Sequence, residues 1–257
     1  MLFKPEQGIR WRRWRGLLAG ACLGLSAWQP LQAYSLPAAN GEGNRALPAL
    51  GLNAAQGQRA FEAGSAAFEQ EEYVLARRHW EPAARRGHAR SQFYMGLLHD
   101  ARIGVQPDAE RAAIWFRLAA RQGLPDAQHK LALAYARGEG VPRDISRALR
   151  WWLRAARGGN TDSQYNLGVI YTLGRGGIGR NPHKAAHWWR QAAIGGDPMA
   201  QFNLGTFYAN GDAGQRDLCQ ALHWWRKSQR NGLPQADDAL AALRHRFDAQ
   251  GCQVTGR

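Results

Sequence analysis

Two histidines, His183 and His187, come closest in this sequence to a metal-binding pattern. Side chains four residues apart lie on one face of a helix, so the pair could supply half of a zinc site. The sequence offers no convergent third ligand, although His223 holds the matching position of a later segment and could lie close in a stack of helices. Histidines on a solvated outer face explain the pair more simply, and we expect no metal ion.

Other catalytic patterns fail on their context. The stretch "GRGGIG" at 174–179 has the glycines of a dinucleotide-binding loop, but such a loop must follow a strand and begin a helix. Here helical patterns lie on both sides. The pair Glu71-Glu72 is expected to be solvated, and no Ser-His-Asp or Cys-His set stands out. We therefore predict a non-enzymatic protein with no catalytic residues and no cofactor.

The aromatic residues follow an internal repeat, whose period decides the fold class. The phrases "AAIWFRLAARQG", "ALRWWLRAARGG", "AAHWWRQAAIGG" and "ALHWWRKSQRNG" place tryptophan at the same position four times. Their spacing divides this part of the chain into units of 36 or 37 residues, namely 91–126, 127–162, 163–199 and 200–235.

Each unit has the pattern of two helices. Its opening segment carries apolar residues three and four apart, such as Leu167 and Tyr171. A glycine-rich loop follows, with Asp144 placed to cap a second helix that stops at Gly158 and Gly159. One such pair cannot bury its apolar face alone, so the units are predicted to stack into a solenoid.

Glycines and tryptophans recur at fixed positions of these helices. A glycine in mid-helix costs about 1 kcal/mol relative to alanine, so its recurrence predicts that the second helix crosses closely there. Adjacent helical positions point about 100° apart, so Trp152 can face its own unit while Trp151 turns toward the next. We expect both rings to be buried in an architectural role rather than a ligand-stacking one. The recurring glycines are Gly96, Gly168 and Gly205, and the structural tryptophans are Trp80, Trp115, Trp152, Trp189 and Trp225.

This pattern resembles the Sel-one-like (Sel1-like) repeat, a longer-looped relative of the tetratricopeptide repeat. The resemblance covers residues 91–235, and residues 58–90 are similar to a degenerate, shorter-looped copy. It implies an all-α fold, a right-handed α-solenoid of stacked antiparallel helix pairs. A C-terminal capping helix at 236–250 and a tail at 251–257 complete the predicted organisation.

The same resemblance implies that the first helices line a concave groove suited to a peptide or a partner's helix. Inter-repeat packing of several groove residues is an alternative that the sequence leaves open. The predicted groove residues are Phe93, Leu97, His129, Leu133, Arg137, Tyr165, Val169, Phe202, Thr206 and Asn210.

The N-terminus carries the features of an export signal. Residues 1–33 combine a basic start, an uncharged stretch of 13 residues and a small residue, Ala33, at the expected cleavage point. Thirteen residues are fewer than the roughly 20 that span a bilayer, so an uncleaved anchor is disfavoured, as is a lipoprotein modified at Cys22. Residues 34–57 have the composition of a flexible linker. We predict a periplasmic or secreted protein.

Two cysteines remain after signal cleavage, Cys219 and Cys252. In an oxidising compartment an even number of cysteines favours a disulfide, which would tie the last repeat to the tail. Two reduced thiols are the alternative.

The chain is basic, with a formal charge of +14 that falls to +10 when residues 1–33 are removed. Second-helix arginines such as Arg150 and Arg154 are expected to form a basic outer wall.

The leading prediction is a scaffold or adaptor that binds a protein or peptide in the bacterial cell envelope. Binding of anionic glycan or peptidoglycan is an alternative. A cell-wall or β-lactam hydrolase is a second alternative, disfavoured because this chain lacks the cysteine pairs of the family members linked to that activity. Nucleic acid is not an expected partner of an exported protein, and no transmembrane segment is expected after cleavage.

Overall fold

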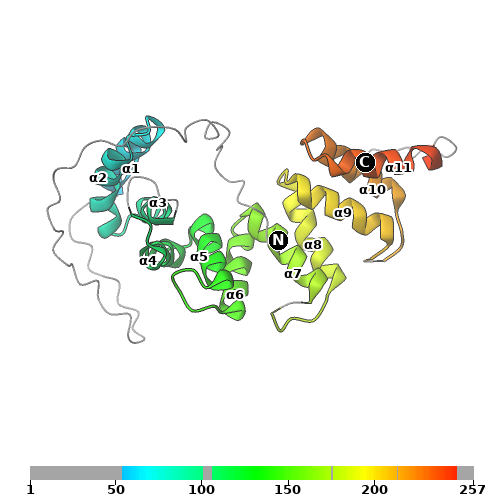
Figure 1. Cartoon of the computed structure of the whole chain (residues 1–257), viewed down its shortest axis with the longest axis horizontal. Coiled ribbons are helices and arrows are strands. Elements are labelled where there is room, and N and C mark those ends of the chain that lie inside the picture. The colour runs from blue at the N-terminus through cyan, green and yellow to red at the C-terminus, as the bar shows by residue number, and fades with distance from the viewer. Residues whose placement is uncertain (1–53, 101–105, 175, 213, 248–257) are drawn as a thin grey trace. The chain divides into compact units, whose positions relative to one another are not determined.

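The computed structural model describes residues 54–100, 106–174, 176–212 and 214–247, and within these ranges it is all-helical, with no strand. Figure 1 labels the helices in chain order. Their bounds are α1 (Ala54–Glu69), α2 (Tyr73–Arg85), α3 (Ala89–Asp100), α4 (Ala109–Arg121), α5 (Pro125–Arg137), α6 (Ile145–Arg157), α7 (Thr161–Leu173), α8 (Pro182–Ile194), α9 (Pro198–Asn210), α10 (Leu218–Arg230) and α11 (Gln235–Phe247).

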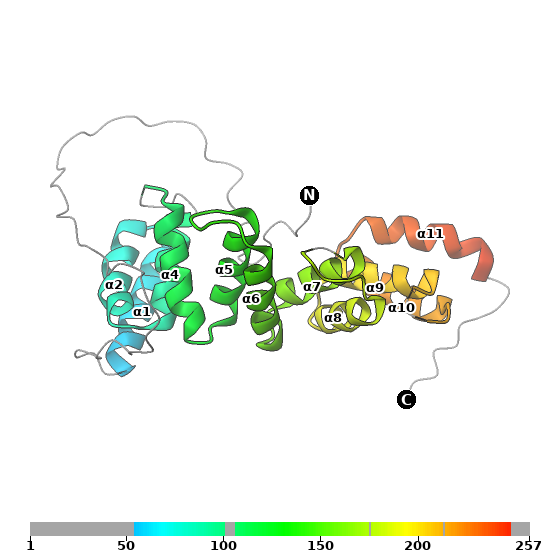
Figure 2. The ribbon, with the colours of Figure 1, turned by 90° about the horizontal axis from the view of Figure 1, so that it is seen from below.

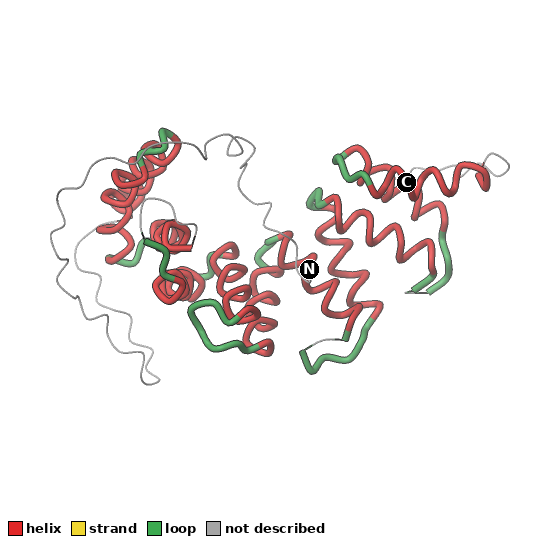
Figure 3. The backbone as a smooth tube through the Cα atoms, in the orientation of Figure 1, coloured by secondary structure: helices red, strands yellow, loops and turns green. Residues whose placement is uncertain are grey.

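The helices form pairs, and the pairs stack in sequence order. The most extensive packing joins α1 to α2, α3 to α4, α5 to α6, α7 to α8 and α9 to α10. Each second helix also packs against the first helix of the next pair, and α11 packs on α10. Figures 1 and 2 show α5 beside α6 from two directions, and Figure 3 shows the longer loop within that pair. The predicted α-solenoid of stacked antiparallel helix pairs is confirmed.

Several predicted boundaries differ from the observed ones or lie outside the described residues. The predicted linker 34–57 extends too far, because α1 begins at Ala54. Helices α3, α5, α7 and α9 each begin two residues before the predicted start of their unit, as at Pro125 and Pro198, because the capping residue lies before the first recurring small residue. The predicted signal peptide, the rest of the linker and the tail lie outside the described residues.

The second helices of the last four repeats begin at the same type of cap, which α2 lacks. The Asp144 carboxylate accepts a hydrogen bond of 2.8 Å from the Arg147 N–H, as its position in the sequence predicts. Asp108, Asn181 and Asp217 make the matching bond for α4, α8 and α10. Replacing such a cap by alanine typically costs about 1 kcal/mol, so the repeated Asp or Asn explains why each loop ends where it does.

A second repeated contact joins each unit to the one before it. The glutamine at the fourth position of α3, α5, α7 and α9 donates its side-chain N–H to the carbonyl of an alanine near the end of the preceding second helix, at 3.0 to 3.1 Å. These glutamines are buried, so the bond satisfies an otherwise unpaired helix-end carbonyl. The pairs are Gln92 with Ala84, Gln128 with Ala120, Gln164 with Ala156, and Gln201 with Ala193.

The recurring glycines make room for aromatic rings. A Cβ built on Gly205 would lie 2.6 Å from Cδ1 of Trp225, and one built on Gly168 would overlap the indole of Trp189. The first helix therefore lacks a side chain where the ring from the second helix lies across it, rather than where the two backbones meet. Gly64 with Trp80 and Gly96 with Phe116 repeat the arrangement.

Trp115 is placed differently from the sequence prediction. It aligns with Trp151, not with Trp152, and the fully enclosed position of its unit is occupied by Phe116, which is 3% exposed. Trp115 itself is half-buried and packs against the hydrophobic cluster formed by α1, α2 and α3. The adjacent aromatic pair in "AIWFRL" made the two positions difficult to separate from sequence alone.

Candidate binding surfaces

The ten predicted groove residues all lie on α3, α5, α7 and α9, but they do not form a continuous exposed row. His129, Leu133 and Tyr165 are buried, at 7%, 3% and 7% exposure. We call the remaining seven the first-helix surface; five of them are half-buried and two, Arg137 and Asn210, are exposed. The half-buried members are Phe93, Leu97, Val169, Phe202 and Thr206.

His129 shows why the row is interrupted at α5. Its Nδ1 lies 2.8 Å from Oγ of Ser163, which belongs to the next unit, and both residues are buried. The His129 side chain therefore makes a contact between two repeats. Such inter-repeat packing is the alternative to a groove position that the sequence left open. The structure leaves α5 almost wholly buried, with Arg137 at its exposed C-terminal end.

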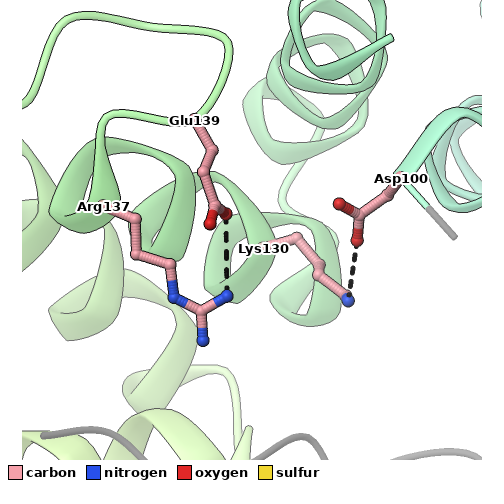
Figure 4. Close-up of polar contacts among 4 residues, drawn as sticks. All are labelled: Asp100, Lys130, Arg137 and Glu139. Carbon is pink, nitrogen blue, oxygen red and sulfur yellow. Dashed lines mark hydrogen bonds and ion pairs between the residues drawn. The ribbon is translucent and has the colours of Figure 1, made fainter. Parts of the chain in front are cut away.

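Two ion pairs involve residues of α5. Lys130 Nζ lies 3.3 Å from Oδ2 of Asp100 and so links α5 to the end of α3, while Arg137 Nη1 lies 3.6 Å from Oε2 of Glu139 in the following loop (Figure 4). Arg137 and Glu139 are exposed, so their pair contributes little to stability.

The outer tryptophans of the second helices are enclosed to different extents. The prediction that Trp151 is buried like Trp152 is wrong, because Trp151 is half-buried and the Arg154 guanidinium lies over its ring at 4.7 Å from the centroid. Lys227 lies over Trp224 at 4.8 Å from the centroid, but Trp224 is itself buried, at 7% exposure. The two outer rings thus share a cation above the ring and differ in how far the rest of the chain encloses them.

The remaining sequence candidates do not come together as a reaction centre. Glu71 and Glu72 are exposed in the turn between α1 and α2. The glycine-rich stretch 174–179, of which residue 175 lies outside the described residues, stands between α7 and α8 and therefore does not follow a strand. Within the described ranges no three His, Cys, Asp or Glu side chains form a group that could hold a metal ion. His223 does not approach the other two histidines as a ligand, but lies edge-on to Trp224 at 5.2 Å between ring centroids.

His183 and His187 line a small pocket that the sequence did not reveal. It lies between α8, α9 and the loop after α9, with a volume of about 200 Å³. Arg190 Nη2 donates a hydrogen bond of 2.6 Å to Tyr208 Oη in its wall. The lining residues are His183, Ala186, His187, Arg190, Leu204, Phe207, Tyr208, Gly214 and Gln215.

Cys219 is exposed at the second position of α10 and is disulfide-bonded. Cys252 lies outside the described residues, so the Cys219–Cys252 pairing stays a prediction. Of the described helices, none has the length and apolar character needed to cross a membrane.

His99 is a buried titratable residue that the sequence did not single out. Burial, followed by the nearby Arg111 guanidinium, lowers the pKa of His99, while Asp108 and the Gln106 backbone raise it to a lesser extent. The folded chain therefore favours the neutral imidazole.

We expect the free energy of unfolding to fall as the pH drops below the ordinary histidine pKa of about 6.5, because the unfolded chain binds the proton first. His99→Gln should reduce the loss of stability between about pH 7.5 and pH 5, measured by urea unfolding at each pH. Part of the loss remains, since burial also lowers the pKa of His88. An unchanged loss in His99→Gln would contradict the assignment.

Comparison with known proteins places these helix pairs in a family. Residues 57–88, 89–124, 125–160, 161–197 and 198–233 each match the Sel1 repeat. The last four matches begin where α3, α5, α7 and α9 begin, and the first, 57–88, is shorter than the others, as predicted for this unit. No curated protein matches the chain in sequence.

Two solved structures show the same fold. A Sel1 repeat protein from Oxalobacter formigenes is 28% identical, with a TM-score of 0.67 over 71% of this chain and 75% of that one. The protein c5321, a protective antigen of uropathogenic Escherichia coli with an SLR fold, is 29% identical, with a TM-score of 0.66 over 74% of this chain. The match spans only 42% of the length of c5321. Since five repeats cover more than half of the sequence, the chain belongs to the Sel1 repeat family.

Proposed function

We propose that this protein is a non-catalytic scaffold of the cell envelope that binds a protein or peptide partner on its first-helix surface. One observation carries the proposal. Apolar side chains at two matching positions remain partly exposed on three of the first helices, namely Phe93 and Phe202 at one position and Leu97 and Val169 at the other, whereas α5 buries both of its residues there. Partly exposed apolar side chains are the usual material of a protein-binding surface.

The described second helices differ from the first in how they place their aromatic residues. Trp152 is fully buried, and Trp151 is half-buried with a cation over its ring. The second helices also carry exposed apolar residues, namely Val74 and Leu75 on α2 and Ile194 at the end of α8, so the proposal depends on the first-helix residues alone. The envelope location rests on the export signal predicted for residues 1–33.

A site-specific crosslinker tests the proposal. We expect a photoreactive phenylalanine analogue at Phe202 or Val169 to capture the same partner from an envelope fraction, and an analogue at the exposed outer residue Arg226 to capture none. Because the surface is mainly apolar, the adduct should persist when salt is raised from about 0.05 M to 0.5 M. Adducts formed only at Arg226, or none at any position, would contradict the scaffold proposal.

Anionic glycan is the second candidate, and the cation-covered tryptophans favour it. Arg154 over Trp151 and Lys227 over Trp224 repeat one arrangement of charge and aromatic ring on two second helices. Arg150 and Arg157 lie exposed on the helix that carries Trp151. Binding of a polyuronate to this wall should weaken steeply with salt and be lost in the Arg150→Glu/Arg154→Glu variant, while Phe202→Ala leaves it unchanged.

A further inference from the structure

The pocket between α8 and α9 has an apolar floor and a polar rim. Leu204 and Phe207 are buried at its base, while His183, His187 and Arg190 are exposed around it. Its volume of about 200 Å³ is below the roughly 300 to 1,000 Å³ of pockets for drug-sized ligands. It therefore suits a group about as large as one amino-acid residue.

Two positions of α8 contribute to the cavity. In α6, the positions that match Ala186 and Arg190 carry Leu149 and Leu153, which are both half-buried. Ala186 is shorter than the matching leucine, and Arg190 places a guanidinium at the pocket instead of an apolar side chain.

The loop after α9 contributes the second gap. Three residues before the helix cap, the loops of the two preceding units carry Val141, which is buried, and Ile178, which is half-buried. The matching residue after α9 is Gly214, which has no side chain and lines the pocket. The cavity thus arises where an alanine on the helix and a glycine in the loop coincide.

The rim is built from hydrogen-bond donors. Arginine has no acceptor atom, so Tyr208 Oη accepts the 2.6 Å bond from Arg190 and its own O–H proton stays available to donate elsewhere. Arg190 has further N–H donors, and no described carboxylate forms an ion pair with it. His183 and His187 add ring nitrogens, and no Asp or Glu is among the described residues that line the pocket.

We propose that this pocket binds a carboxylate carried on a short branched apolar body. The apolar part would lie on Leu204, Phe207 and Ala186, and the carboxylate would accept from Arg190 and Tyr208. Charge-assisted bonds of this kind are roughly twice as strong as neutral ones, and arginine matches a carboxylate in shape. Either a small free carboxylic acid or the carboxyl-terminal residue of a peptide has this chemistry.

The pocket is separate from the first-helix surface and does not depend on the proposed function. On α9 it uses Leu204, Phe207 and Tyr208, whereas the first-helix surface uses Phe202 and Thr206. Loss of binding at one site therefore leaves the other to be tested independently.

Calorimetric titration of the full chain with three probes tests the proposal. The probes are 4-methylpentanoate, acetyl-Ala-Ala-Leu with a free carboxyl group, and the same peptide as its amide. We expect at least one of the two acids to bind and the amide to bind about tenfold more weakly than the acid peptide or not at all. A peptide acid that binds about tenfold more tightly than 4-methylpentanoate identifies a chain terminus as the ligand, and the reverse order or equal affinity identifies a free acid.

Three variants locate the binding. Arg190→Gln should weaken the acid about tenfold or more, and Ala186→Leu, which copies Leu149 of α6, should abolish binding by filling the cavity without unfolding the chain. Arg154→Gln removes the same charge from the outer wall and should change nothing. Equal affinity for acid and amide, unchanged binding in a folded Ala186→Leu variant, or no saturable binding up to about 10 mM would each overturn the proposal.

Discussion

Trp152→Ala is expected to lower the free energy of unfolding by about 3 to 5 kcal/mol, among the larger effects of any single substitution in this chain. The Trp152 side chain is fully buried, and its counterparts in other units lie directly over a first-helix glycine. Truncation removes the buried indole and leaves a cavity that the surrounding helices can close only in part. Equilibrium urea unfolding followed by circular dichroism measures the change.

Trp151→Ala is the matched control. It removes the same side chain one position away, on the same helix, but this ring is half-buried under Arg154. Its loss should cost no more than about 1.5 kcal/mol, since a cation over an exposed ring contributes about 0.5 to 1 kcal/mol. Similar costs for the two variants would show that the adjacent tryptophans are not divided into an enclosed and an outer ring.

Gly140→Ala is expected to cost about 3 kcal/mol or more, because it combines backbone strain with a collision against another repeat. Gly140 has a φ of +69°, which disfavours any residue with a Cβ. A Cβ there would also overlap the carbonyl oxygen of Ala109 and lie 2.7 Å from the Glu110 nitrogen. Both atoms are backbone at the start of α4, so neither can rotate away.

Gly177→Ala separates the two causes. Gly177 has a φ of +78°, but a Cβ built on it meets nothing within 4 Å. This substitution should cost only the conformational strain, about 1 to 2 kcal/mol. Thermal and urea unfolding of both variants check the difference. If Gly140→Ala were no worse than Gly177→Ala, the loop of one unit would not rest on the preceding second helix.

The repeated features of the fold could be predicted from the sequence because each depends on residues close together in the chain. The Asp144 cap requires only that a carboxylate precede a helix, and the paired helices follow from a pattern repeated in every unit. The enclosed ring of the unit 91–126 was harder to assign. Trp115 and Phe116 are adjacent, and only packing shows that Phe116 is the buried one.

Features that depend on two units at once could not be predicted from the sequence. His129 matches Phe93 and Phe202 in position, and its burial depends on Ser163 of the following unit. The pocket beside Arg190 needs Ala186 and Gly214 to be small in different elements. A comparison of the loops could have shown that Gly214 departs from Val141 and Ile178, but its effect depends on which helix the loop covers.

The order in which the helices pack also shapes how the chain folds. The extensive packing of the described part joins helices that follow one another in sequence, from α1 with α2 to α10 with α11. Proteins dominated by such short-range contacts have low contact order and fold quickly, since little loop entropy is lost before a contact forms. A nascent chain can thus consolidate each hairpin as it emerges, and a pulling force applied at one terminus can detach the hairpins one after another while those behind them stay assembled.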